Sequence, residues 1–466
     1  MRYIPVTCEQ REAMLRAVGV ADVDVLFDVI PEAVRVVGGL DLPEGLSEIE
    51  LSSHLSALAD QNISASELVS FMGAGCYDHY VPSLVDHVLS KPEFFTAYTP
   101  YQPEVSQGTL QAIYEYQSMI CALTGMDVSN ASMYDGATAL VEAALMACRV
   151  TRRSTVVCLP TVHPEWQNTL ATYADAGQFS VAEPPSVDVA SGATLLAGLA
   201  DEALLGLAEV LGRGDVAAVL VQSPNFFGSF EDLERIARMA HESGALLVVA
   251  TNPILLGIME PPSAYGADIV VGEGQPLGGA TSFGGPGLGF FTCRQEHVRQ
   301  MPGRIVGRTV DVDGAMAFVL TLSTREQHIR REKATSNICS NHALNALAAG
   351  TYLSAVGEHG LAGIVRSCVA KAHYLRQQLL ATGRFRAPWE ADFGYEFALE
   401  FLGDVRSMQD ALLTKGFFAG VDVSDVEAEH ATGMLPAAGA NLVLFAVTEK
   451  NTRAEMDAFA LEVASL

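Results

Sequence analysis

The stretch GADIVVGEGQPLGGATSFGGPG, residues 266–287, joins a short apolar run to a long glycine-rich loop. In open α/β sheets, ligands and reactive groups lie just past the carboxyl ends of the strands. The loop therefore has the position of a catalytic loop, but its centre carries only Glu273 and Gln275 and no lysine, histidine or cysteine. The stretch predicts a strand-to-loop site that lacks its reactive residue.

The chain around this stretch alternates between helical and strand patterns. Continuous apolar runs separated by amphipathic helices indicate a mostly parallel sheet with helices on both faces. A long helix over residues 341–380 then leads to a smaller α/β unit. The predicted strands are 155–159, 216–222, 245–250, 268–271, 395–401 and 441–448, and the other predicted helices are 110–121, 136–150, 195–211, 230–241 and 452–463.

The N-terminal part of the chain reads as helical. Ser47 and Glu50 form a capping box in front of Leu51, Leu55 and Leu58, which share one helix face. A chain of 466 residues is long for one domain. We predict three parts: a helical N-terminal segment (1–90), a large domain (91–335), and a linking helix with a small C-terminal α/β domain (336–466).

Composition excludes several classes of function. The net charge of −27 argues against non-specific binding to nucleic acid or to an anionic membrane. No apolar run approaches the ~20 residues of a membrane span, and the N-terminal MRYIPVTCEQREAM resembles no export signal. The eight cysteines are scattered without a C-x-x-C pair, so we expect neither a metal site nor a disulfide framework. We expect a cytoplasmic protein.

Three segments with site chemistry follow predicted strands or begin predicted helices. Gly136, Ala137 and Thr138 begin a helix whose free N–H groups would suit a phosphate. His163 offers an imidazole after one strand, and a Ser-Pro-Asn turn at 223–225 follows another. Each feature has a plain structural alternative, namely an ordinary helix start, a structural histidine and a surface turn. Their order along the chain is more informative than any one of them.

That order resembles the large domain of the fold-type I pyridoxal-phosphate (PLP) enzymes, and the resemblance implies a mostly parallel sheet of a seven-stranded type. The resemblance implies an Asp against the pyridine nitrogen and a Lys that forms the Schiff base, a role that needs an amine. Here Gln275 stands at the lysine position, and no lysine occurs between Lys91 and Lys333. The expected Asp is also missing, because residues 251–253 are Thr-Asn-Pro. We therefore expect no PLP chemistry from this chain alone.

Longer segments resemble a narrower family. The chain is similar to the glycine cleavage system P-protein, and specifically to subunit 1, the N-terminal half of its split bacterial form. The resemblance runs almost from end to end. Its main segments are FMGAGCYDHYVPSLVDHVL (71–89), EFFTAYTPYQPEVSQGTLQAIYEYQ (93–117), LTGMDVSNASMYDGATALVEAALMA (123–147), EGQPLGGATSFGGPGLGFF (273–291) and REKATSNICSNHAL (331–344).

This resemblance implies a function shared between two chains. Enzymes of the family decarboxylate glycine on PLP and pass the aminomethyl group to the lipoyl arm of H-protein. In the split form two related subunits pair, as two heterodimers, and the PLP-bearing lysine belongs to subunit 2. Gln275 fits subunit 1. We accordingly expect no covalent cofactor on this chain, PLP on subunit 2, and vestigial cofactor-pocket positions at Gly136, Ala137, Thr138, His163 and Gln275.

Two further segments are candidates for contact with the partner. One is rich in hydrogen-bonding groups and has no amphipathic period, so it either faces the partner's active site or forms a structural loop. The other, residues 294–333, carries eight cationic residues against five acidic ones. Arginine suits bidentate contact with carboxylates or phosphates, although surface ion pairs are the plainer reading. The residues of the first segment are Tyr98, Thr99, Tyr101, Gln102, Glu104, Ser106 and Gln107.

Two alternative functions are open from the sequence. The chain would be an independent PLP lyase or aminotransferase if another lysine, such as Lys333, held the cofactor. It would be a non-enzymatic scaffold if it had kept the fold and lost every enzymatic partner. The missing Lys and Asp count against the first alternative. Only the family resemblance separates the second from a subunit of an enzyme.

Overall fold

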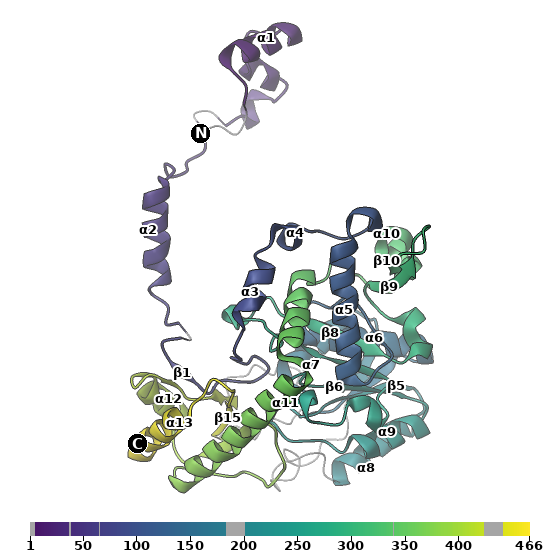
Figure 1. Ribbon diagram of the computed structural model, residues 1–466, viewed down its shortest axis with the longest axis vertical. Coiled ribbons are helices and arrows are strands. Elements are labelled where there is room, and N and C mark those ends of the chain that lie inside the picture. The colour runs from purple at the N-terminus through teal and green to yellow at the C-terminus, as the bar shows by residue number, and fades with distance from the viewer. Residues whose placement is uncertain (1–4, 37–38, 65, 183–200, 339, 424–440) are drawn as a thin grey trace. The chain divides into compact units, whose positions relative to one another are not determined.

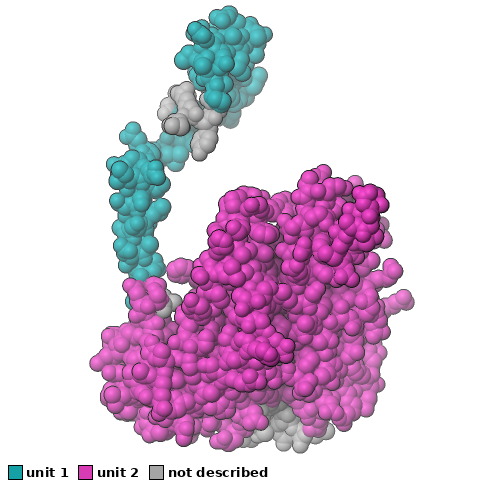
Figure 2. All heavy atoms as spheres, in the orientation of Figure 1, with its two compact units in different colours: residues 1–63 teal, residues 64–466 magenta. Residues whose placement is uncertain are grey.

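The protein is described by a computed structural model that covers residues 5–36, 39–64, 66–182, 201–338, 340–423 and 441–466. The chain forms two compact units, residues 1–63 and 64–466, coloured separately in Figure 2. In the first unit, α1 (Cys8–Val18) and α2 (Glu48–Ala59) each begin with a capping box. The Ser47–Glu50 box confirms the prediction. Two short 3-10 helices, Asp24–Phe27 and Glu32–Val34, lie between these helices in the chain.

The first unit has no core among its described residues, because none of residues 5–36 and 39–63 is buried. It contains 19 of the 38 large apolar residues that are exposed in the described chain. The apolar face of α2 is among them, with Leu51, Leu55 and Leu58 all about half exposed. Apolar residues gain stability only when they are removed from water. These helices therefore carry apolar side chains that their own unit does not cover.

The second unit is built around a seven-stranded sheet with the order β2-β8-β7-β6-β5-β3-β4. The five strands from β7 to β4 are parallel, and β8 and β2 pair antiparallel at one edge. This confirms the predicted mostly parallel sheet. The strands are β2 (Val128–Ser129), β3 (Thr155–Cys158), β4 (Ser180–Ala182), β5 (Val216–Gln222), β6 (Leu246–Ala250), β7 (Ile269–Glu273) and β8 (Gly289–Cys293).

Alternate residues of each strand enter two different cores, as a sheet buried on both faces requires. Val156, Leu220 and Val248 pack with α6 and α7, whereas Val219 and Val249 pack with the helices of the opposite face. Figure 1 shows helices around the central strands. The helices on the two faces are α5 (Gln107–Thr124), α6 (Gly136–Thr151), α7 (Pro164–Asp175), α8 (Asp201–Leu211) and α9 (Leu233–Glu242).

A smaller sheet with the order β11-β12-β15-β14 forms the C-terminal part. The long helix α11 (Ala343–Ala381) runs from α5 to this sheet and to α13, as Figure 1 shows. β1 pairs in parallel with β13, and β9 with β10 in a hairpin. The bounds are β1 (Val69–Ser70), α3 (Ser83–Leu89), α4 (Pro92–Phe95), β9 (Ile305–Val310), β10 (Met316–Thr321), α10 (Gln327–Arg330), β11 (Phe385–Arg386), β12 (Glu396–Phe401), α12 (Val405–Leu413), β13 (Phe417–Phe418), β14 (Val421–Asp422), β15 (Leu442–Ala446) and α13 (Arg453–Ser465).

Most predicted elements match observed ones within a few residues. The predicted helix 195–211 is observed as α8 from Asp201, and its first six positions lie outside the described residues. The three-part division at residues 90 and 335 stays a prediction. Across the described residues, no helix combines the length and the apolar character that crossing a membrane requires.

Candidate functional site

A cavity of about 540 Å³ lies beside the start of α6, at the carboxyl ends of the strands. That volume is within the range of small-molecule sites. His163, Glu273 and Gln275 line it, and a narrower cavity of about 50 Å³ shares His163 and Glu273 and reaches Asn225 and Asn252. The loops after β3, β5, β6 and β7 thus meet at one place, where the sequence analysis expects the site.

His163 is held in one orientation by hydrogen bonds at both ring nitrogens. Nε2 lies 3.0 Å from the carbonyl oxygen of Ala74, and Nδ1 accepts from the backbone N–H of Glu165. These bonds favour the neutral ring with its proton on Nε2. Burial lowers the pKa of His163, which also favours the neutral form. The ring stacks near Trp166, with centroids 6.2 Å apart. His163 therefore belongs to the cavity wall.

The start of α6 differs from the expectation of free N–H groups. The N–H of Gly136 donates to Glu273 Oε2 at 3.0 Å, and the N–H of Thr138 donates to Asp135 Oδ1 at 2.7 Å. Two carboxylates of the chain thus take the place predicted for a phosphate, because an acidic side chain at a helix start is stabilised by the same N–H groups and dipole. A Cβ at Gly136 would come within 2.4 Å of the Trp166 ring, so only glycine permits this close approach.

Gln275 is buried and uses both ends of its amide. Its Nε2 donates to the carbonyl oxygens of Tyr77 and Gly279, at 3.1 and 2.7 Å, and its Oε1 accepts from the N–H of Tyr77 at 3.1 Å. These bonds join the loop after β7 to the segment that follows β1. Gln275 is therefore a structural connector at the position where the resemblance places a lysine.

Glu396 is a buried acid that the sequence analysis did not single out. Its carboxylate accepts from the Tyr77 hydroxyl at 2.7 Å and from the N–H of Ala74 at 2.6 Å. Burial raises the pKa of Glu396 to about 7, although both hydrogen bonds act in the opposite direction. The only signal in the sequence was an acid inside the apolar strand pattern of residues 395–401.

The residues of this cavity do not fit pyridoxal phosphate. Gln275 cannot form a Schiff base, and Asn252 supplies no negative charge for a pyridinium nitrogen. Asp135, Glu165 and Glu273 line the cavity, whereas none of its described lining residues is Lys or Arg. A phosphate would meet carboxylates on the N–H groups that it needs. The cavity keeps the position of a cofactor site without its chemistry.

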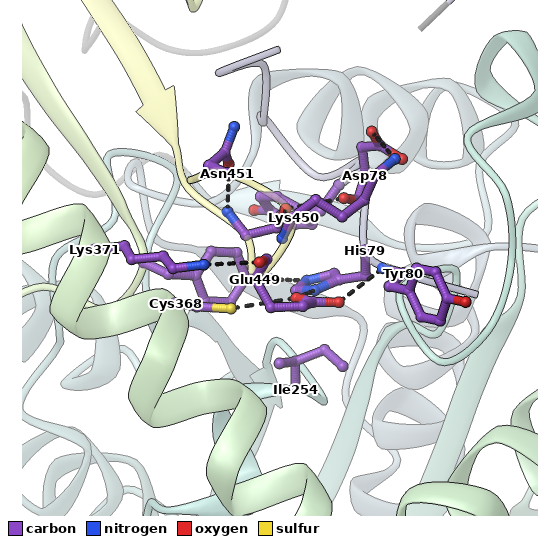
Figure 3. Close-up of polar contacts among 12 residues, drawn as sticks. Asp78, His79, Tyr80, Ile254, Cys368, Lys371, Glu449, Lys450 and Asn451 are labelled. Carbon is purple, nitrogen blue, oxygen red and sulfur yellow. Dashed lines mark hydrogen bonds and ion pairs between the residues drawn. The ribbon is translucent and has the colours of Figure 1, made fainter. Parts of the chain in front are cut away.

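A polar cluster connects this region to helix α11 and the C-terminal loop (Figure 3). Glu449 accepts from His79 Nδ1 and from the N–H of Tyr80, both at 2.7 Å, and lies 3.4 Å from Cys368 Sγ. Burial raises the pKa of Glu449, but the hydrogen bond and charge of His79 together with backbone hydrogen bonds, one of them from Tyr80, outweigh it and bring that pKa to about 2. The ligand atoms of His79, Cys368 and Glu449 lie within 4.8 Å of one another, as metal ligands would. Hydrogen bonds already join them, so we interpret the cluster as a structural connection.

The predicted partner-facing segment divides into exposed and anchored residues. Tyr98, Gln102 and Glu104 are exposed, and Tyr98 is 79% exposed. Gln107 is anchored, because its amide exchanges hydrogen bonds with both backbone groups of Phe318. The other members lie between these extremes: Thr99 and Ser106 are half-buried, and Tyr101 is 45% exposed with its hydroxyl 3.1 Å from Arg304.

The cationic segment meets the predicted partner-facing segment at Tyr101. Arg304 lies over the Tyr101 ring at 5.3 Å and pairs with Glu326 at 3.3 Å. Arg325 donates to the carbonyl oxygens of Met301 and Gly303, and Arg294 pairs with Asp268. These arginines thus make contacts within the chain, in line with the plainer reading of the charge cluster.

The comparisons with known proteins agree with this geometry. The family model described as "Glycine cleavage system P-protein" matches residues 1–459. The chain belongs to the glycine cleavage system P-protein family. A relative from Desulforamulus reducens, named "Probable glycine dehydrogenase (decarboxylating) subunit 1", is 48% identical over 100% of both chains. A second, from Geobacillus kaustophilus, has the same name and is 49% identical over 99% of this chain and 98% of the relative.

Solved structures extend the comparison to the fold. A crystal structure of glycine decarboxylase (P-protein) of the glycine cleavage system, in inhibitor-bound form, has a TM-score of 0.86 and 41% identity over 100% of both chains. A sphingosine-1-phosphate lyase from Burkholderia pseudomallei has a TM-score of 0.63 at 14% identity over 94% of each chain. The second likeness concerns the fold alone. It places this P-protein family member in the fold class predicted from the order of its segments.

Proposed function

We propose that this chain is the subunit of a heteromeric glycine decarboxylase that does not carry the PLP lysine. A related subunit 2 would hold PLP and decarboxylate glycine, and the aminomethyl group would pass to the lipoyl arm of H-protein. Gln275 carries the proposal, because its amide is bonded on both sides at the lysine position. The relatives named subunit 1 support it, since that name implies a partner subunit.

The first unit supports the assembly with subunit 2. Its apolar residues, including the α2 face of Leu51, Leu55 and Leu58, are exposed in the described chain. Interfaces of permanent complexes bury such residues in quantity. We place this face against subunit 2. A cytoplasmic complex of two heterodimers stays a prediction of the family resemblance.

The exposed part of the segment 98–107 is our candidate for completing the partner's active site. Tyr98 and Glu104 are available for contact, because Tyr98 is 79% exposed and Glu104 is exposed too. Gln107 and Tyr101 hold the segment to the rest of the chain through Phe318 and Arg304. A group placed by such anchors can position a substrate without large loss of entropy. In this proposal the chain supplies positioning groups and subunit 2 supplies the cofactor.

The test is reconstitution with a subunit 2 homologue. The two chains are purified separately and mixed, and lipoyl-dependent glycine decarboxylation and glycine–bicarbonate exchange are measured. Activity is expected only in the mixture, with no PLP bound to the isolated chain. An adduct of PLP with any lysine of the isolated chain, trapped by borohydride and located by mass spectrometry, would contradict the proposal. Failure of the two chains to associate would favour the scaffold alternative.

A further inference from the structure

Strand β7 ends in a carboxylate, that of Glu273, which points at the start of α6. Glu273 Oε2 accepts from the N–H of Gly136 at 3.0 Å, and Oε1 accepts from the N–H groups of Gln275 and Leu288 at 2.8 and 2.7 Å. One side chain therefore collects hydrogen bonds from a helix start, from its own loop and from the residue just before β8. Such a convergence of backbone N–H groups is the arrangement that binds anions in proteins.

Among the described residues, Glu273 has no Lys or Arg as a partner. The 540 Å³ cavity beside it is lined by two further acids, Asp135 and Glu165, and by no Lys or Arg among the described residues. Burial raises the pKa of Glu273, and the N–H groups that it accepts from act in the opposite direction. The dipole of α6, a helix of 16 residues, also favours the negative charge. The Glu273 carboxylate also packs closely against the backbone of Gly287, because a Cβ at Gly287 would lie only 2.9 Å from Glu273 Oε2.

We propose that Glu273 is a built-in anion that occupies the place where a ligand phosphate would bind at the start of α6. The carboxylate satisfies the N–H groups that a phosphate would use and repels a second anion at the same position. This role of Glu273 rests on the proposed function. It gives a physical reason why PLP would bind to subunit 2 and not to this chain. A mere loss of the lysine would leave the phosphate site open.

The test is chemical rescue of the full-length chain with Glu273→Ala. The substitution leaves the three N–H groups of Gly136, Gln275 and Leu288 without their carboxylate. Inorganic phosphate and acetate are titrated, and the Tm is measured against sodium chloride at equal ionic strength. Because phosphate also strengthens protein stability in general, the readout is the difference between the variant and the unchanged chain. Glu165→Ala is the matched control, since Glu165 is an exposed acid of the same cavity.

Glu273→Ala is expected to have a lowered Tm that both anions raise by at least about 2 °C more than in the unchanged chain or in Glu165→Ala. Titration calorimetry should then find one phosphate per variant chain. An equal response of all three proteins, or rescue by acetate without any by phosphate, would overturn the proposal. If Glu273→Ala does not fold in plain buffer, refolding decides: a higher yield in phosphate than in chloride supports the proposal, and an equal yield overturns it.

These outcomes are independent of the reconstitution test. The rescue experiment uses the isolated chain and needs no subunit 2, PLP or glycine. A phosphate response in Glu273→Ala with no activity in the mixed subunits would uphold the built-in anion and overturn the proposed function. Activity in the mixture with no phosphate response would do the reverse.

Discussion

The polar side chains of the cofactor-like cavity are bonded within the chain, whereas the large apolar side chains of the first unit are exposed. In the cavity, Glu273, Gln275 and Glu396 all bond to groups of the same chain. In residues 1–63, the apolar side chains are exposed, and none of the described residues there is buried. The polar groups of the cavity are thus bonded within the chain, whereas the described residues of the first unit form no core of their own. The exposed apolar side chains of the first unit are therefore the surface that we propose for contact with subunit 2.

The largest expected effect is on assembly. Leu51→Asp combined with Leu55→Asp should weaken binding to a subunit 2 homologue by about a thousandfold, because each buried apolar anchor contributes about 2 kcal/mol. The Tm of the isolated chain should stay unchanged, since both side chains are about half exposed. Binding is measured by sedimentation or a biosensor. Ser53→Asp on another face of α2 is the control, and an unchanged dissociation constant would remove α2 from the interface.

The second effect is a pH dependence of stability that originates at Glu396. Burial gives this carboxyl a folded-state pKa of about 7 against 4.5 for the free group. The contribution of protonated Glu396 to the free energy of unfolding is fully present below pH 4.5. It is lost as the pH rises through 7, because the unfolded chain releases the proton at a lower pH than the folded chain. Across this pH range the free energy of unfolding falls by about 3 kcal/mol.

Denaturant unfolding of the unchanged chain and of Glu396→Gln at pH 5 and pH 8 checks this effect. The amide can still accept from the N–H of Ala74 but does not titrate. The stability of the unchanged chain relative to the variant should therefore fall between these pH values. A constant difference would mean that Glu396 is ionised in the folded chain at both pH values.

The third effect concerns the connection made by Gln275. Gln275→Leu keeps the volume but leaves backbone groups of Tyr77 and Gly279 without partners. Unpaired buried polar groups are costly, so we expect a loss of about 2–3 kcal/mol in the free energy of unfolding. Leu461→Ile, a conservative change of an exposed side chain, is the control variant and should leave the free energy of unfolding unchanged. A loss under about 0.5 kcal/mol would show that the segment after β1 does not depend on this amide.

The smallest effect is on catalysis by the assembled complex. Glu104→Gln should lower kcat of glycine decarboxylation by about tenfold, which corresponds to about 1.4 kcal/mol of lost positioning. Assembly and Tm should not change, because Glu104 is exposed in the isolated chain. Gln111→Glu, on the exposed side of α5, is the matched control. An unchanged kcat would make the segment 98–107 a structural loop.

Much of the fold follows from local patterns in the sequence. Strands such as β5 and β6 are continuous apolar runs, and α6 and α13 begin at capping residues, so their positions depend on neighbouring residues alone. The meeting of His163, Asn252 and Gln275 follows from the rule on parallel strand ends. These parts of the site could be predicted because they depend on strand order.

The rest depends on contacts between distant parts of the chain. Glu396 reaches Tyr77 only because β12 and the segment after β1 come together across 319 residues. The bond from Gly136 to Glu273 needs one rotamer of one side chain, which no periodicity reveals. The expectation of free N–H groups at Gly136 and Thr138 was wrong for this reason.

The pairing of β1 with β13 bears on how the protein is made. Val69 pairs with Phe417, and Phe71 accepts from the N–H of Ala446. The segment that reaches Gln275 and Glu396 is thus held by residues near the opposite end of the chain. During synthesis all strands of the central sheet, which end at Cys293, are made before those residues. Because contacts between distant residues form slowly, we expect this wall of the cavity to close among the last steps of folding.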